Sequence, residues 1–116
     1  MKQFQIFQIW KAELPAIEGS HVQWGYRPVI IVSNDLANAY SPVVTVIPLT
    51  SRKEKKHLRT HVHLKNDGLT TESLALCEQI LTIDKSRLRR FVGVIRDPAD
   101  RAAIHRAMSV QLGMAA

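Results

Sequence analysis

The feature that most constrains the fold of this chain is a series of short apolar segments with the period of a β-strand. Along residues 4–14 the even-numbered positions are apolar except for Gln8, and Pro15 ends the pattern. A period of two places one face of a strand toward the interior. Further short apolar or β-branched segments are predicted to be strands at 29–33, 43–49 and 60–64, and two more short strands fit 73–83 and 91–95.

The segments between these strands are predicted to be irregular. Residues 15–26 form a loop with two glycines, residues 34–42 are polar and turn-rich, and residues 50–59 form a charged connection. Asn66-Asp67-Gly68 predicts a turn.

The C-terminal part of the chain has a helical pattern instead. Asp97 is expected to cap a helix with Pro98 at its first position, and Gly113 can end it. Apolar residues recur along one helical stripe at Ile104, Ala107, Met108 and Leu112. We therefore expect an α+β fold, mainly β with a C-terminal α-helix, whose strands form a small barrel that protects their edges.

Length and charge narrow the class of protein. A chain of 116 residues is expected to form one domain over 1–116, and its net charge of +6 favours an anionic partner, with nucleic acid ahead of a membrane surface. The single cysteine, Cys77, lies in an apolar setting and is expected to be a buried, inert thiol. With neither a secretory signal nor a membrane span in the sequence, we expect a cytoplasmic protein that does not bind membranes.

Familiar catalytic and metal-binding motifs are missing from the sequence. There is no Cys-x-x-Cys, His-Glu-x-x-His, phosphate-binding loop or Gly-x-Ser-x-Gly, and the carboxylates are scattered. His61 and His63 share a strand face but have no obvious third ligand, so we expect no metal and no cofactor. Because the carboxylates are scattered and a two-metal nuclease needs several oxygen ligands at one site, that class of enzyme is also disfavoured.

Cleavage of RNA can proceed without such motifs, because the 2′-OH of the substrate can attack the neighbouring phosphate. The protein must then supply a cation for the phosphorane, hydrogen-bond donors to the same oxygens and a route for two protons. Arginine suits the first task, because its planar fork matches a phosphate, and threonine or serine suits the second.

Three segments of the chain are similar to the MazF/PemK family of toxin endoribonucleases: Gly25-Tyr26-Arg27-Pro28-Val29-Ile30-Ile31-Val32-Ser33-Asn34-Asp35, Val44-Thr45-Val46-Ile47-Pro48-Leu49-Thr50-Ser51, and Glu78-Gln79-Ile80-Leu81-Thr82-Ile83-Asp84-Lys85-Ser86-Arg87-Leu88. The resemblance extends over nearly the whole chain, from the first strand to Gly113. It implies a small barrel like that of Src-homology domains, assembled as a homodimer, and an antitoxin partner that occludes the RNA groove.

The same resemblance implies metal-independent, sequence-specific cleavage of single-stranded RNA, leaving a 2′,3′-cyclic phosphate and a 5′-OH. Arg27 falls on the family's catalytic arginine and Thr50 on its catalytic threonine or serine. Because a guanidinium stays protonated, we assign Arg27 to phosphorane stabilisation rather than proton transfer. His21 is a candidate for assisting with protons, since imidazole titrates near neutrality, although an exposed and silent side chain is the simpler interpretation.

RNA contacts are expected from the loop before Arg27, from the residues after Thr50 and from one further glutamine: Gln23, Trp24, Tyr26, Ser51, Arg52, Lys53, Lys55, Lys56 and Gln79. The chain departs from the family at Phe7-Gln8, in the longer loop 19–25 and at Leu81. Two alternatives stay open. One is a non-cleaving toxin of the CcdB type that poisons DNA gyrase, against which Arg27 and Thr50 argue. The other is a decayed module that only binds nucleic acid or antitoxin.

Overall fold

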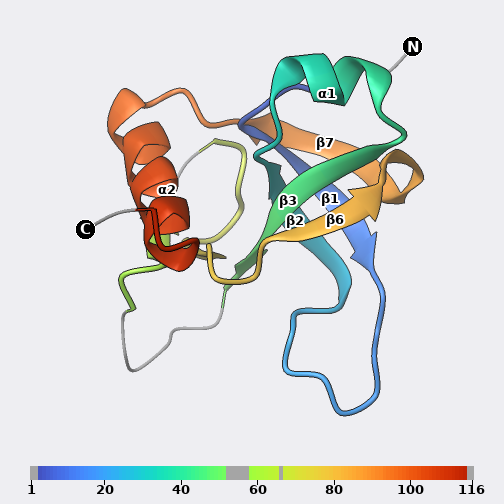
Figure 1. The fold of residues 1–116 in the computed structure, drawn as a ribbon, viewed down its shortest axis with the longest axis horizontal. Coiled ribbons are helices and arrows are strands. Elements are labelled where there is room, and N and C mark those ends of the chain that lie inside the picture. Colours follow the sequence, from blue (N-terminus) through green and yellow to red (C-terminus); the bar gives the residue numbers. More distant parts are fainter. Residues whose placement is uncertain (1–2, 52–57, 66, 115–116) are drawn as a thin grey trace.

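The computed structural model describes residues 3–51, 58–65 and 67–114. Its elements follow the order strand–strand–helix and then four strands before a short 3₁₀ turn, a last strand and a long helix (Figure 1). They are β1 (Gln8–Leu14), β2 (Gly25–Ile31), α1 (Asp35–Tyr40), β3 (Val43–Thr50), β4 (His61–Leu64), β5 (Ser73–Leu76), β6 (Leu81–Asp84), η1 (Lys85–Arg87), β7 (Leu88–Val94) and α2 (Pro98–Gln111).

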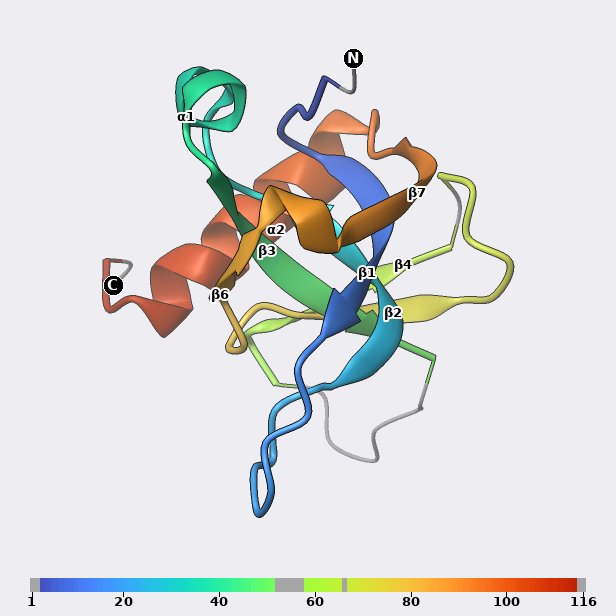
Figure 2. The same cartoon turned by 90° about the vertical axis from the view of Figure 1, so that its right-hand side faces the viewer.

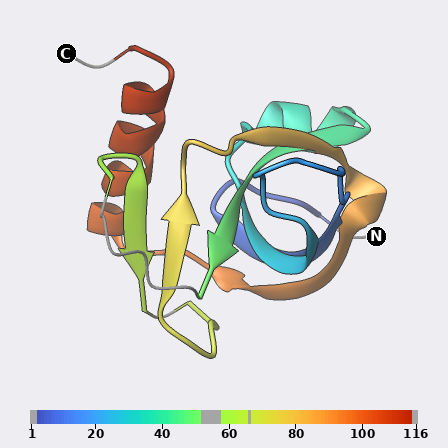
Figure 3. The same ribbon diagram turned by 90° about the horizontal axis from the view of Figure 1, so that it is seen from below.

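All strand pairs are antiparallel, and β3 connects the two halves of the sheet. On one side β3 pairs with β2, which continues through β1 to β7. On its other side β3 pairs first with β6 and then, at Leu49 and Thr50, with β5, which in turn pairs with β4. Figure 3 shows the strands from β7 to β6 rolled up on one side of β3, with β4, β5 and α2 on the other.

The predicted barrel is therefore only partly correct. The strand ladder rolls up but does not close, because no β6–β7 pairing occurs within the described part of the chain. These two strands are joined by η1, a single 3₁₀ turn that spans the remaining gap. The mainly β fold with a C-terminal helix agrees with the prediction.

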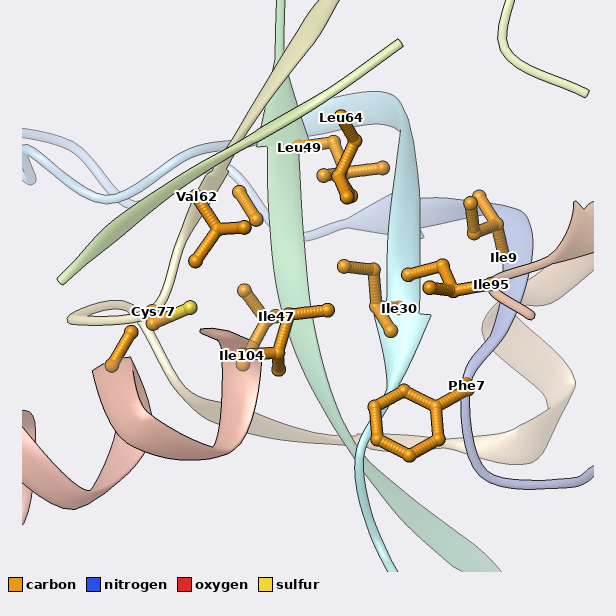
Figure 4. Packing of buried hydrophobic residues seen from close by; sticks show 12 residues of the cluster. Phe7, Ile9, Ile30, Ile47, Leu49, Val62, Leu64, Cys77, Ile95 and Ile104 are labelled. Carbon is orange, nitrogen blue, oxygen red and sulfur yellow. The ribbon is translucent and has the colours of Figure 1, made fainter. Parts of the chain in front are cut away.

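Two hydrophobic clusters lie on the two faces of the rolled sheet. The inner cluster fills the roll and includes Trp10, Val29 and Val46. The outer cluster joins the sheet to β4 and α2, with Ile30, Ile47 and Ile104 fully buried (Figure 4). Alternation along each strand sends successive side chains to opposite clusters, which is why β2 and β3 are buried on both faces.

The C-terminal helix follows the sequence prediction closely. The Asp97 side chain accepts a hydrogen bond from Ala99 N, Pro98 begins the helix, and Gly113 has the left-handed φ of +69° just after its end. Ile104 and Ala107 are buried, but Leu112 is 58% exposed, so the apolar stripe ends one turn earlier than predicted. No helix of the described residues is long and apolar enough to cross a membrane.

Three local predictions were wrong. Residues 34–42 contain the helix α1, because Asn34 caps it by accepting from Ala37 N and because the buried Asn38 amide bonds to Ser33 O. The first strand starts at Gln8 rather than at residue 4, since Phe7 has a φ of +70° that breaks the extended backbone. The last strand also begins earlier, at Leu88.

Candidate active site

Arg27 and Thr50 lie at the same end of two neighbouring strands. The hydrogen-bonded register of β2 and β3 pairs Ile31 with Val46 and ends with Val29 opposite Pro48. Continued two residues beyond the last observed pair, this register would place Arg27 opposite Thr50, on the strand face that carries Val29. The antiparallel sheet thus brings the strand ends that carry these two residues, 23 positions apart in the sequence, to the same side of the fold.

The guanidinium of Arg27 is fixed through one nitrogen and open at the others. Its Nε donates to the carbonyl oxygen of Trp24 at 2.6 Å. The two Nη groups have no protein partner among the described residues, and none of the ion pairs found there involves Arg27. A half-buried arginine held in this way presents the two-nitrogen edge that binds a phosphate.

The backbone that holds Arg27 is itself anchored from another part of the chain. Gln23 N donates to the side-chain Oε1 of Gln79 at 2.8 Å, across a separation of 56 residues. Gly25, with a φ of +86°, then turns the chain into β2. Gln79 therefore fixes the segment whose next residue, Trp24, accepts the hydrogen bond from Arg27. The Oε1 of Gln23 is buried and has no hydrogen-bond partner in the described structure.

The two hydroxyl residues that end β3 differ in accessibility. Thr50 is only 3% exposed and pairs with Leu74 of β5. Ser51, the next residue, is exposed and lines the adjacent cleft. The predicted catalytic hydroxyl thus lies beneath the surface at the end of β3, whereas the neighbouring hydroxyl is open to a ligand.

A cleft of about 580 Å³ begins at Arg27 and Ser51. It is lined by β1, the start of β2, the end of β3, the β4–β5 loop and β7. Lys11, Arg27 and Arg90 contribute three positive charges, and no carboxylate is among its described lining residues. Trp24, Tyr26 and Phe91 add aromatic rings that are about half exposed, between 48% and 57%. Cations and exposed rings in one cleft suit a single-stranded nucleic acid.

The cleft depends on a close approach between the β4–β5 loop and β7. A Cβ atom added to Gly93 would lie 1.9 Å from the carbonyl oxygen of Asp67, and one added to Gly68 would lie 2.2 Å from that of Val92. Only glycine fits at either position, so these two residues set the distance between the cleft walls.

The remaining predicted site residues are placed as follows. Trp24 and Tyr26 line the cleft, while the half-buried Gln23 and Gln79 support its Arg27 end. His21 is exposed in the β1–β2 loop, which projects from the rolled sheet (Figure 2), and it does not line the cleft. The basic residues Arg52, Lys53, Lys55 and Lys56 lie outside the described residues.

The two strand histidines belong to separate ion pairs. His61 Nε2 lies 2.9 Å from Glu78 Oε2, and Thr60 Oγ1 donates to Glu78 Oε1 at 3.1 Å. His63 Nδ1 lies 3.4 Å from Glu72. Within residues 3–51, 58–65 and 67–114, no group of three or more histidine, cysteine or acidic side chains is placed to hold a metal ion.

Sequence reasoning missed the far part of the cleft. Lys11, Arg90 and Phe91 line it, and so do hydroxyl residues of the β4–β5 loop. Lys11 and Arg90 are basic residues within strands, and a charge on the solvent-facing side of a strand is too common to indicate a binding site. Their meeting depends on the β1–β7 pairing, which the sequence does not reveal.

Comparison with known proteins supports the resemblance seen in the sequence. Residues 5–112 match the family model of the PemK-like, MazF-like toxin of type II toxin–antitoxin systems. The chain is 36% identical over 108 residues to an endoribonuclease MazF of Staphylococcus saprophyticus, covering 91% of this chain and 88% of the relative.

Solved structures share the fold. A MazF of Deinococcus radiodurans superposes with a TM-score of 0.76 at 25% identity, covering 98% of this chain and all (100%) of the other. A mycobacterial endoribonuclease in complex with its cognate antitoxin superposes with a TM-score of 0.77 at 23% identity, over 95% of each chain.

Proposed function

Since the chain belongs to the PemK-like, MazF-like toxin family of type II toxin–antitoxin systems and is an endoribonuclease of that family, we propose that it cuts single-stranded RNA without a metal ion and that Arg27 binds the phosphate at the bond that is cut. The observation that carries this proposal is the guanidinium of Arg27, which is fixed through Nε, has no Nη partner among the described residues, and lies at the mouth of a cleft whose described lining contains no carboxylate.

In the proposed reaction the 2′-oxygen of the RNA attacks the adjacent phosphorus. A bond forms between the 2′-oxygen and phosphorus, and the bond from phosphorus to the 5′-oxygen breaks, leaving a 2′,3′-cyclic phosphate and a 5′-OH. A water molecule accepts the proton of the 2′-OH, and a second water donates a proton to the departing 5′-oxygen, so the numbers of protons lost and gained are equal. Arg27 stabilises the phosphorane, in which negative charge on the equatorial oxygens is greatest.

The hydroxyl donors at the end of β3 complete the phosphate site. We assign hydrogen bonding to the phosphate oxygens to Thr50, and substrate binding to the exposed Ser51. Single alanine variants separate these roles, because loss of Thr50 should lower kcat whereas loss of Ser51 should chiefly raise KM. The exposed position of His21, away from the cleft lining, gives its assistance with protons no geometric support, so His21→Ala is expected to leave the pH profile unchanged.

The decisive experiment is digestion of a long unstructured RNA by the purified protein in EDTA, with both product ends mapped. Cyclic phosphate and 5′-OH ends at a repeated short sequence are expected. Cutting that needs a divalent cation, or products with a 5′-phosphate, would overturn the mechanism. Arg27→Ala, purified in parallel, controls for contaminating ribonuclease.

Partners and assembly follow from the family. We propose that residues 1–116 act as a single domain in a cytoplasmic homodimer and that a cognate antitoxin covers the RNA site. Light scattering after gel filtration tests the dimer. Protection of RNA on addition of the antitoxin tests the second point, and an antitoxin that binds without inhibiting cleavage would contradict it.

A further inference from the structure

Two like charges face each other on the wall of the cleft away from Thr50. Lys11 of β1 and Arg90 of β7 are direct neighbours in the antiparallel register. Like charges placed opposite each other destabilise a strand pair. Neither side chain has an ion-pair partner in the described structure, and Glu13, which lies on the same strand as Lys11, is engaged by Arg89 at 3.1 Å. No carboxylate among the described residues therefore neutralises Lys11 or Arg90.

These charges belong to the same cleft as Arg27. Lys11 Nζ lies 5.5 Å from the centre of the Tyr26 ring, and Tyr26 directly precedes Arg27. Phe91, the residue after Arg90, lines the cleft with 48% of its surface exposed. A continuous surface of cations and rings thus leads from the phosphate site at Arg27 along β1 and β7.

The opposite wall is polar and uncharged at this point. Thr70 and Thr71 of the β4–β5 loop provide hydroxyl groups, and the glycine contact between Gly93 and Asp67 holds this loop against β7. Hydroxyl donors and cations both bind phosphate oxygens, while exposed rings stack on unpaired bases. An acidic peptide would use the charges but would have no equivalent need for the rings, so the combination favours single-stranded RNA.

We propose that Lys11 and Arg90, with the rings of Tyr26 and Phe91, form a second subsite that binds a phosphate and a base of the RNA flanking the bond cut at Arg27. This subsite rests on the proposed function, because it extends the same substrate away from the same reacting phosphate. It increases the affinity for longer substrates and takes no part in the chemical step.

The test compares a double variant with a matched control. Lys11→Gln/Arg90→Gln removes both charges and keeps most of each aliphatic stem. Arg87→Gln/Arg96→Gln removes two exposed charges that do not line the cleft. Both proteins are first shown to have the wild-type Tm, and single-turnover and steady-state cleavage is then measured on a minimal RNA and on one extended by several unpaired nucleotides.

We expect the cleft variant to have a several-fold higher KM on the extended RNA, with kcat unchanged and with little change on the minimal RNA. Its affinity for an extended RNA that carries a 2′-deoxy residue at the cut site should also depend less on salt. The slope of log K against log salt should fall by about 0.7, because the subsite binds one phosphate and each phosphate contact to a single strand contributes about 0.7.

The outcomes are distinguishable from failure of the proposed function. If the wild-type protein cuts no RNA, the proposed function fails, and the salt slope with the 2′-deoxy RNA still decides the subsite. If the cleft variant matches the control in both KM and salt slope, the subsite is overturned. Loss of binding to a poly-glutamate peptide but not to RNA would also overturn it, in favour of an acidic protein partner.

Discussion

The cleft at Arg27 and the cluster around His61 contain similar residue types in opposite arrangements. His61 has a side chain only 4% exposed and lies 2.9 Å from Glu78, whose other oxygen accepts from Thr60. In the cleft, by contrast, Lys11, Arg27 and Arg90 have no carboxylate beside them among the described lining residues. Buried polar groups are normally paired because an unpaired one costs free energy.

The difference indicates what each region does. The His61–Glu78–Thr60 cluster joins the start of β4 to the segment that follows β5, and its hydrogen bonds are satisfied within the chain. The cleft leaves its cations accessible, and a surface of one sign of charge attracts an anionic ligand. The polar groups around His61 are therefore partnered within the fold, whereas the cations of the cleft are available for binding.

The largest expected effect is on cleavage by Arg27 variants. Arg27→Ala should lower kcat by about 10²–10³-fold, the usual loss when one donor to a developing oxyanion is removed. Arg27→Lys should rescue little, because a point charge does not replace the two-nitrogen edge. The Tm should stay within error of wild type, since Arg27 makes one hydrogen bond to backbone. Wild-type activity in either variant would show that Arg27 is not a catalytic residue.

Gln79 should show an intermediate effect that separates positioning from binding. Gln79→Ala removes the acceptor for Gln23 N and loosens the backbone that holds Arg27, so kcat should fall by up to about 10²-fold. Gln79→Glu keeps an acceptor oxygen, and we expect it to restore kcat while raising KM by repelling phosphate. Equal kcat values for the two variants would show that the hydrogen bond to Gln23 does not matter.

The paired cluster should respond in stability instead of activity. Glu78→Ala leaves two buried or nearly buried groups without the carboxylate they share, and we expect the free energy of unfolding to fall by about 1–3 kcal/mol. Urea denaturation measures this, and His63→Ala, which alters an exposed pair, is the matched control. A larger loss of stability in His63→Ala than in Glu78→Ala would show that the exposed His63 pair, and not the buried His61 cluster, stabilises the fold.

Cys77 should give the smallest effect. Burial, with a contribution from Glu78, raises the pKa of this thiol from 9.0 to about 12, so it stays protonated and unreactive in the folded protein. Because the folded pKa is the higher one, stability should decline as the pH rises above about 9.0, where only the unfolded thiol ionises. A thiol reagent should label Cys77 in urea but not in buffer, and fast native labelling would contradict its burial.

The sequence predicted those parts of the molecule that depend on local pattern. The C-terminal helix was predicted by Asp97, Pro98 and Gly113, because caps act within one turn. The six-residue helix α1 was missed because its polar residues are also those of turns, and only Asn34 and the hydrogen bonds of Asn38 select the helix.

The candidate site was predictable only where family motifs carry it. Arg27 and Thr50 were proposed through those motifs, and they lie at the same end of the neighbouring strands β2 and β3. The opposition of Lys11 and Arg90, and the anchoring of Gln23 by Gln79, depend on contacts between distant segments. Neither hydrophobic periodicity nor charge pattern contains that information, because both describe only neighbours in sequence.

The central claim is that the RNA supplies the nucleophile and Arg27 stabilises the charge that develops. It is tested most directly with one oligonucleotide in which the nucleotide on the 5′ side of the cut bond lacks its 2′-OH. The wild-type protein's rate of cutting at that bond is then compared with its rate at the same bond of the all-ribose strand, with the same fraction of each oligonucleotide bound. We predict no cutting at the modified bond, and cutting at an undiminished rate would contradict the mechanism.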